Sequence, residues 1–146
     1  MRAKVKVVLT LFAMVLATFA LGATPAYADS PPAGCTYYDG GTGNNTYYDS
    51  CFEYSGDDHW VLDKESNGWS AGAQIQTDYG KTRWCVNTET AGNWHECKFD
   101  HREECAVRWR LYEQNRSDPA QPTRRWTAWT PWISVSSGLP TGGELC

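Results

Sequence analysis

Residues 105–112 read Cys-Ala-Val-Arg-Trp-Arg-Leu-Tyr, and they alternate between two kinds of side chain. The odd-numbered residues of this stretch are apolar or Cys, whereas two of the even-numbered ones, Arg108 and Arg110, are charged. An alternation with a period of two places one kind of residue on each side of an extended chain. We therefore predict a half-buried β-strand over 105–112.

The rest of the chain repeats this pattern in short pieces. Turn-forming residues separate the pieces, as in Ser66-Asn67-Gly68, Asp78-Tyr79-Gly80 and Ala91-Gly92-Asn93. The further expected strands are 57–65, 69–77, 82–87, 94–99 and 132–136. No window keeps apolar residues at helical spacing. The sequence therefore predicts an all-β fold, a compact antiparallel β-sandwich or barrel braced by disulfides, with an extended Tyr-rich N-terminal arm.

The cysteines predict the bracing. There are six of them: Cys35, Cys51, Cys85, Cys97, Cys105 and Cys146. An even number in a small exported protein favours three disulfides, and the absence of a C-x-x-C pair disfavours a zinc site or a redox centre. Spacing alone does not choose among the possible pairings. We prefer near neighbours, Cys35 with Cys51 and Cys85 with Cys97, which leaves Cys105 for Cys146.

The first 28 residues have the features of a signal peptide. Three basic residues precede an almost wholly apolar run over 7–21, and Ala26-Tyr27-Ala28 fits a signal-peptidase site. We expect a secreted, extracellular protein that begins at Asp29. Removal of this leader takes away three of the 13 Lys and Arg but none of the 17 Asp and Glu, so the net charge changes from −4 to −7.

This negative charge excludes some partners. A general nucleic-acid binder needs a basic surface to neutralise phosphates, and this chain is acidic. No later apolar run reaches the roughly 20 residues that span a bilayer. We therefore expect neither a nucleic-acid partner nor a membrane partner after the leader is removed.

A Tyr-rich segment follows the leader. Residues 29–50 contain Thr-Tyr-Tyr-Asp twice, at 36–39 and 46–49, around a centre rich in Gly and Asn. The segment is either a hairpin clipped by two cysteines or an N-terminal arm, ahead of a β-rich domain over 51–146. Exposed tyrosines offer contact area and a hydroxyl at low entropic cost, which favours a recognition role. The candidate binding residues here are Tyr37, Tyr38, Tyr47 and Tyr48.

Three tryptophans near the C-terminus are spaced W-x-x-W-x-x-W: Trp126, Trp129 and Trp132. This spacing resembles the Trp ladder of thrombospondin type 1 repeats, in which indoles stack between arginines. The match covers only residues 126–132, and the cysteines that follow the ladder in that family are absent, so we interpret it as a local similarity. It predicts Trp–Arg stacking worth ~0.5–2 kcal/mol per pair. The same indoles could form a sugar-stacking platform, or two of them could close the core.

The candidate catalytic residues are the three histidines, His59, His95 and His101. With neighbouring carboxylates they could ligate zinc or act as acid and base on RNA. No motif for a zinc hydrolase, a serine nucleophile or a phosphate loop accompanies them, and disulfides would leave no free thiol. We predict a non-enzymatic protein without catalytic residues, cofactor or metal.

The run from Trp60 to Tyr112 resembles the small Cys-stapled secreted proteins of actinobacteria. The resemblance rests on Asn67-Gly68-Trp69-Ser70-Ala71, Tyr79-Gly80, Cys85, Gly92-Asn93-Trp94, Cys97 and Val107-Arg108-Trp109-Arg110. Some of that group are similar to the adaptor of umbrella toxin particles, which links a lectin subunit to the rod of a large toxin. The resemblance implies a secreted adaptor whose N-terminal segment docks into a partner protein.

Three alternatives remain open. The chain could be a lectin-like or cell-wall-binding module that holds a glycan through the three C-terminal tryptophans. It could be a secreted hydrolase inhibitor that presents the loop 36–50 rigidly to a protease. It could also be a small secreted nuclease that uses the histidines.

Overall fold

The structure, a computed structural model, describes residues 30–38 and 45–146, so the expected signal peptide and residues 39–44 lie outside the described residues. The described residues form eight strands and no helix, and therefore include no helix that could cross a membrane. The strands are β1 (Thr36–Tyr38), β2 (Tyr48–Glu53), β3 (Asp58–Asp63), β4 (Trp69–Thr77), β5 (Thr82–Val86), β6 (Trp94–Cys97), β7 (Ala106–Asn115) and β8 (Ile133–Ser134).

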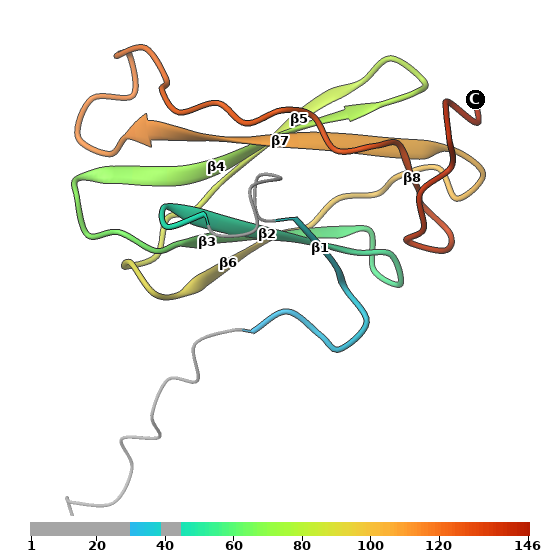
Figure 1. Ribbon diagram of the computed structural model, residues 1–146, viewed down its shortest axis with the longest axis horizontal. Coiled ribbons are helices and arrows are strands. Elements are labelled where there is room, and N and C mark those ends of the chain that lie inside the picture. The colour runs from blue at the N-terminus through green and yellow to red at the C-terminus, as the bar shows by residue number, and fades with distance from the viewer. Residues whose placement is uncertain (1–29, 39–44) are drawn as a thin grey trace, which may run out of the picture.

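The strands form two antiparallel sheets that lie one above the other (Figure 1). The first sheet has the order β1-β2-β3-β6 and the second has the order β5-β4-β7-β8. The predicted all-β, disulfide-braced class is confirmed. The strand predicted over 69–77 coincides with β4, whereas β7 runs three residues beyond the predicted end at Tyr112 because it continues to pair with β4 as far as Asn115.

The described part of the Tyr-rich segment belongs to the first sheet. β1 pairs with β2, with Tyr37 opposite Cys51, and β2 pairs in turn with β3. Cys35 and Cys51 form a disulfide at this pairing. The segment is therefore held in the sheet by strand pairing as well as by a covalent bridge.

The inner faces of the two sheets meet in one apolar core. The alternation predicted for 105–112 is confirmed, because Val107, Trp109 and Leu111 are all fully buried. Phe52 of β2 contributes to the same cluster from the opposite sheet. Trp109 also donates its indole N–H to Ser50 Oγ across the core, at 2.8 Å, so a hydrogen bond ties the sheets together.

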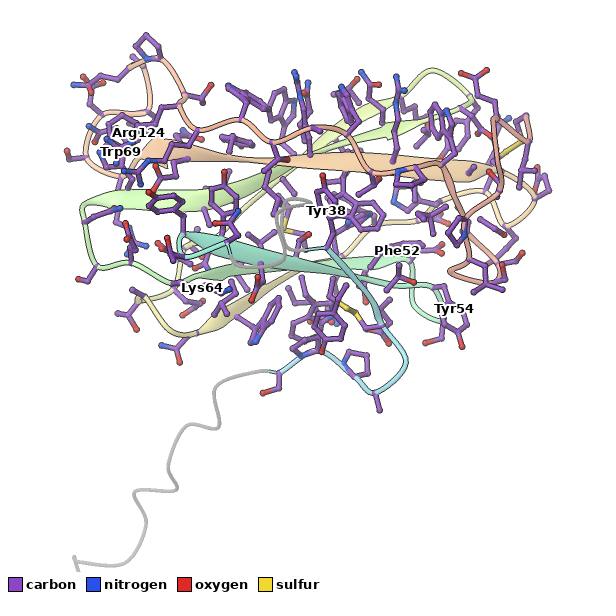
Figure 2. The ribbon with its side chains drawn as sticks, in the orientation of Figure 1. Tyr38, Phe52, Tyr54, Lys64, Trp69 and Arg124 are labelled. Carbon is purple, nitrogen blue, oxygen red and sulfur yellow. A yellow bond between two sulfur atoms is a disulfide. The ribbon has the colours of Figure 1, made fainter. Side chains whose placement is uncertain are left out.

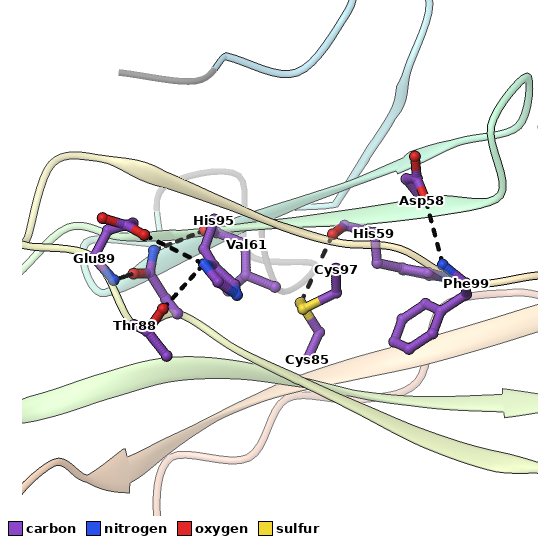
Figure 3. Close-up of a disulfide and its surroundings, with 10 residues drawn as sticks. Asp58, His59, Val61, Cys85, Thr88, Glu89, His95, Cys97 and Phe99 are labelled. Carbon is purple, nitrogen blue, oxygen red and sulfur yellow. Dashed lines mark hydrogen bonds and ion pairs between the residues drawn. A yellow bond between two sulfur atoms is a disulfide. The ribbon is translucent and has the colours of Figure 1, made fainter. Parts of the chain in front are cut away.

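Three disulfides brace this core in the pairing that we preferred, and the described residues contain no free cysteine. Cys85–Cys97 joins β5 to β6, the edge strands of the two sheets on one side of the molecule (Figure 3). Cys105–Cys146 ties the C-terminal residue to the start of β7. Three disulfides are consistent with an extracellular protein.

Candidate functional site

The segment 124–132 runs along the side of β7 that faces away from β4, and two threonines position it. Thr127 donates its N–H to the Leu111 carbonyl and accepts the Leu111 N–H at its hydroxyl, at 2.9 and 2.8 Å. Thr130 makes the same pair of contacts with Trp109, at 2.8 and 3.0 Å. Because the threonines are three residues apart, the tryptophans that recur with the same spacing share a different side of the segment.

On that side the tryptophans alternate with the arginines of β7. The Arg108 guanidinium carbon lies 4.5 Å from the ring centre of Trp132 and 4.9 Å from that of Trp129. The Arg110 carbon lies 4.6 Å from Trp129 and 4.1 Å from Trp126. We call these five residues the Trp/Arg ladder. The predicted Trp–Arg stacking is confirmed, with arginines from β7 as the partners.

Two glutamines of β4 hold the arginines in place. Gln76 Oε1 accepts the Nε and Nη2 protons of Arg108, at 3.1 and 2.9 Å. Gln74 Oε1 accepts the Nε proton of Arg110 at 2.8 Å. A glutamine amide is neutral, so each guanidinium is fixed in position while it keeps its full positive charge.

The ladder continues into a cluster of aromatic rings. Trp126 stacks on Tyr112, with ring centres 4.7 Å apart and planes 25° apart. The Tyr112 ring lies over Gly72 so closely that a Cβ at that position would be 2.5 Å from Tyr112 Cζ. Burial raises the pKa of Tyr112 to about 12. Because Gly72 has no side chain, it leaves the space in which Tyr112 lies and supports Trp126.

Trp84 stands beside this stack. Its ring is nearly perpendicular to both Tyr112 and Trp126, with angles of 81° and 73° and ring centres 5.6 and 6.3 Å away. Half of its surface is exposed, compared with 36% for Trp126. Among the described tryptophans, Trp84 is thus the most accessible, and no sequence motif singles it out.

The ladder changes the interpretation of Trp126, Trp129 and Trp132. None of the three lies in the described core, so the interpretation that two of them close it is wrong. They pack on the outer side of the second sheet because the even-numbered arginines of β7 face that way. A guanidinium lies against each ring of the ladder, which removes indole faces that a sugar would need.

The four candidate tyrosines are placed differently. Tyr48 is buried in the core and donates its hydroxyl proton to the Arg125 carbonyl, and Tyr38 donates to the Ala128 carbonyl at 3.0 Å. Figure 2 shows Tyr38 directed from β1 toward the second sheet. These two tyrosines hold the segment 124–132 from its inner side.

The other two tyrosines lie further out. Tyr47 packs under Arg125, whose guanidinium carbon is 3.8 Å from the ring centre, and Tyr37 is 61% exposed with its ring edge-on to Trp94. Of the four, only Tyr37 presents a large open surface, and it does so on the outer side of the first sheet.

The three histidines do not form one site. His59 and His101 lie in the apolar layer with their ring centres 5.8 Å apart, whereas His95 contacts Thr88 and Glu89 (Figure 3). Burial lowers the pKa of His59 well below its usual range, and burial followed by the charge of Arg83 lowers that of His101 to about 4. Both rings are therefore neutral at pH 7.

Two groups of possible metal ligands occur among the described residues. One consists of Asp78 with the sulfurs of Cys105 and Cys146, which are joined in a disulfide. The other consists of Glu53, Asp58 and Glu96 on the outer side of the first sheet. Each of these three carboxylates already accepts a hydrogen bond or an ion pair, from Trp60, the Phe99 amide and Lys98.

The two outer surfaces of the molecule differ in charge. The strand residues that face outward from the second sheet include Arg108 and Arg110 but no carboxylate. Those that face outward from the first sheet include four carboxylates: Asp49, Glu53, Asp58 and Glu96. The described residues thus carry a cationic, aromatic surface opposite an acidic one.

Comparison of the chain with protein-family models, with curated proteins and with solved structures finds no significant match.

Proposed function

We propose that this chain is a secreted, non-enzymatic interaction protein that binds a protein partner through the Trp/Arg ladder. Its most concrete form is an adaptor that links subunits of an exported toxin particle of the umbrella type, as the family resemblance implies. In that role the partners would be a lectin subunit and the rod of the toxin.

The single observation that carries the proposal is the ladder itself. Tryptophan, tyrosine and arginine are the residues in which the binding energy of protein interfaces concentrates, and here they alternate on one accessible surface. The side chains of Gln74, Gln76, Thr127 and Thr130 accept hydrogen bonds that fix this surface before any partner arrives. A surface that is already ordered loses little side-chain entropy on binding.

The charges of the ladder indicate the chemistry of the partner. Arg116, Arg124 and Arg125 each form an ion pair with a carboxylate of this chain. No ion pair recorded among residues 30–38 and 45–146 involves Arg108 or Arg110. Their charges are left for a carboxylate from outside the chain, so the partner surface should be acidic where it meets the ladder.

The test is co-purification of the native complex from culture fluid, by size exclusion with mass spectrometry of the proteins that elute together. The wild-type chain should elute in a large complex that persists at about 0.15 M salt, because stacked indoles are not screened. Replacing both Arg108 and Arg110 by Gln should reduce the bound fraction at least about tenfold, since each substitution removes a cation.

The matched control is Tyr37→Ala. It removes an aromatic residue that is more exposed than any in the ladder, but from the opposite outer surface. This variant should stay in the complex. The proposal is wrong if the wild-type chain elutes alone, or if the double arginine variant binds the partner as tightly as the wild type.

A further inference from the structure

The outer side of the second sheet also carries the exposed ring of Trp84, which lies beside Trp126 at one end of the Trp/Arg ladder. The Tyr112–Trp126 stack supports one side of the Trp84 ring. The ring has no other aromatic or cationic neighbour among the described residues, and half of its surface is exposed. The indole is therefore partly open to solvent, and its two aromatic neighbours hold it nearly perpendicular to their own rings.

A groove of about 200 Å³ lies further along the strand direction, and Trp84 is not among the residues that line it. Its lining includes Val86, the next outward residue after Trp84 on β5, and Gln114, the next outward residue after Tyr112 on β7. Ser70 of β4 lies opposite Gln114. Val86 and Tyr112 both lie opposite Gly72, so the groove begins in the row of Tyr112 and continues to the row of Gln114, roughly 6.6 Å further along the strands.

Apart from Arg116, the polar groups that line this groove are uncharged. Hydroxyls come from Ser70 and Thr88, and amides come from Asn87, Gln114 and Asn115. Within the described ranges the side-chain amide of Gln114 has no hydrogen-bond partner, so its donor and its acceptor are both open. The side-chain amide of Asn87 already donates hydrogen bonds to the carbonyls of Val61 and Asn93, so it lines the groove in a fixed position.

The one charged residue of the groove is already neutralised. Arg116 pairs with Asp63 at 3.4 Å and also donates to Ser70 Oγ and to the Glu89 carbonyl. A ligand of this groove therefore meets no free charge. It meets a flat indole face at one end and amide and hydroxyl groups at the other.

We propose that Trp84 and this groove form a binding site for a neutral polysaccharide built of β-linked pyranose rings. A pyranose ring with equatorial hydroxyls presents a face of C–H groups that packs on an indole, while its edge presents hydroxyls that bind amides. One sugar would stack on Trp84, and the next along the chain would enter the groove and bind Gln114.

This site goes beyond the proposed protein-binding function and is separable from it. The ladder arginines extend from Trp126 toward β8, whereas the groove extends from Trp84 toward the other end of β7. The groove is also too small for a protein interface, which buries roughly 800 Å² per partner. A chain that bound both could hold a protein against a glycan surface.

The test is affinity electrophoresis of the full secreted chain in native gels that contain laminarin, hydroxyethylcellulose or glycol chitin. The wild-type chain should be retarded by at least one of these neutral polymers. Trp84→Ala should weaken that retardation at least about tenfold, Trp84→Phe should keep part of it, and Gln114→Ala should weaken it less than Trp84→Ala does.

Two controls separate this proposal from the ladder proposal. Tyr37→Ala removes an exposed aromatic residue elsewhere and should be retarded like the wild type, as should the Arg108→Gln, Arg110→Gln double variant. The proposal is overturned if none of the three polymers retards the wild type, or if folded Trp84→Ala and Gln114→Ala are both retarded as strongly as the wild type. It is also overturned if Trp84→Ala loses the protein partner but keeps the glycan.

Discussion

Gly72→Ala should destabilise the protein, because the added Cβ would collide with the ring of Tyr112. The added Cβ would lie 2.5 Å from Tyr112 Cζ, whereas ordinary van der Waals contacts are 3.4–4 Å, so the ring has to move by about 1 Å. Tyr112 cannot move freely, since Trp126 covers it and Trp84 stands against its edge. Overpacking of this kind costs about 1–3 kcal/mol.

The effect of Gly72→Ala on the free energy of unfolding should change sign when the Tyr112 ring is removed. Tyr112→Leu lacks the distal ring atoms that the new Cβ would meet, and alanine is better than glycine inside a strand by roughly 0.5–1 kcal/mol. In that background Gly72→Ala should therefore stabilise the protein. Urea unfolding of the four proteins of this double-mutant cycle gives both values.

Gly143→Ala is the matched control, because nothing lies within 4 Å of a Cβ at that position. It should change the free energy of unfolding by less than about 0.5 kcal/mol. The proposed seating of Tyr112 on Gly72 is refuted if Gly72→Ala costs no more than this control, or if its cost is the same with leucine at position 112.

Two further predictions concern acid and oxidation. Between pH 7 and 5.5 the unfolded state takes up protons that neutral His59 and His101 do not, so the free energy of unfolding should fall as the pH is lowered, by roughly 1 kcal/mol from His101 alone at pH 5.5. Burial raises the pKa of Asp57, which opposes the loss at lower pH; urea unfolding of His101→Asn should show a smaller loss than the wild type, and equal losses would contradict the assignment. Alkylation of the unfolded but unreduced protein should label no cysteine, and labelling of Cys105 or Cys146 would show that this bridge is absent.

The strands and the disulfides could be predicted because their signals are local. Alternation around Trp109 identifies β7, and the turn at Asp78-Tyr79-Gly80 separates β4 from β5, with Gly80 at a φ of 84° that favours glycine. Preference for near neighbours gives the observed cysteine pairs. The strands β1 and β2 were predicted only as one alternative for residues 29–50, a hairpin clipped by Cys35 and Cys51, because polar residues break their hydrophobic pattern.

The site could be predicted only in part, because it depends on contacts between distant segments. The three-residue spacing of the tryptophans and the outward side of Arg108 are both visible in the sequence. Their interdigitation follows from the hydrogen bonds of Thr127 and Thr130 with β7, which no local pattern encodes. Trp84 was missed for the same reason, since its exposure depends on how Tyr112 lies over a glycine of another strand.

Hydroxyl-radical footprinting of the native secreted complex tests the central claim most directly, because it reports the accessibility of individual aromatic side chains. The isolated chain and the chain in its complex would be labelled side by side and compared by mass spectrometry. The account predicts that binding protects Trp126, Trp129 and Trp132 and leaves the labelling of Tyr37 unchanged. Equal labelling of the three tryptophans in both samples, or protection confined to Tyr37 and Trp94, would contradict it.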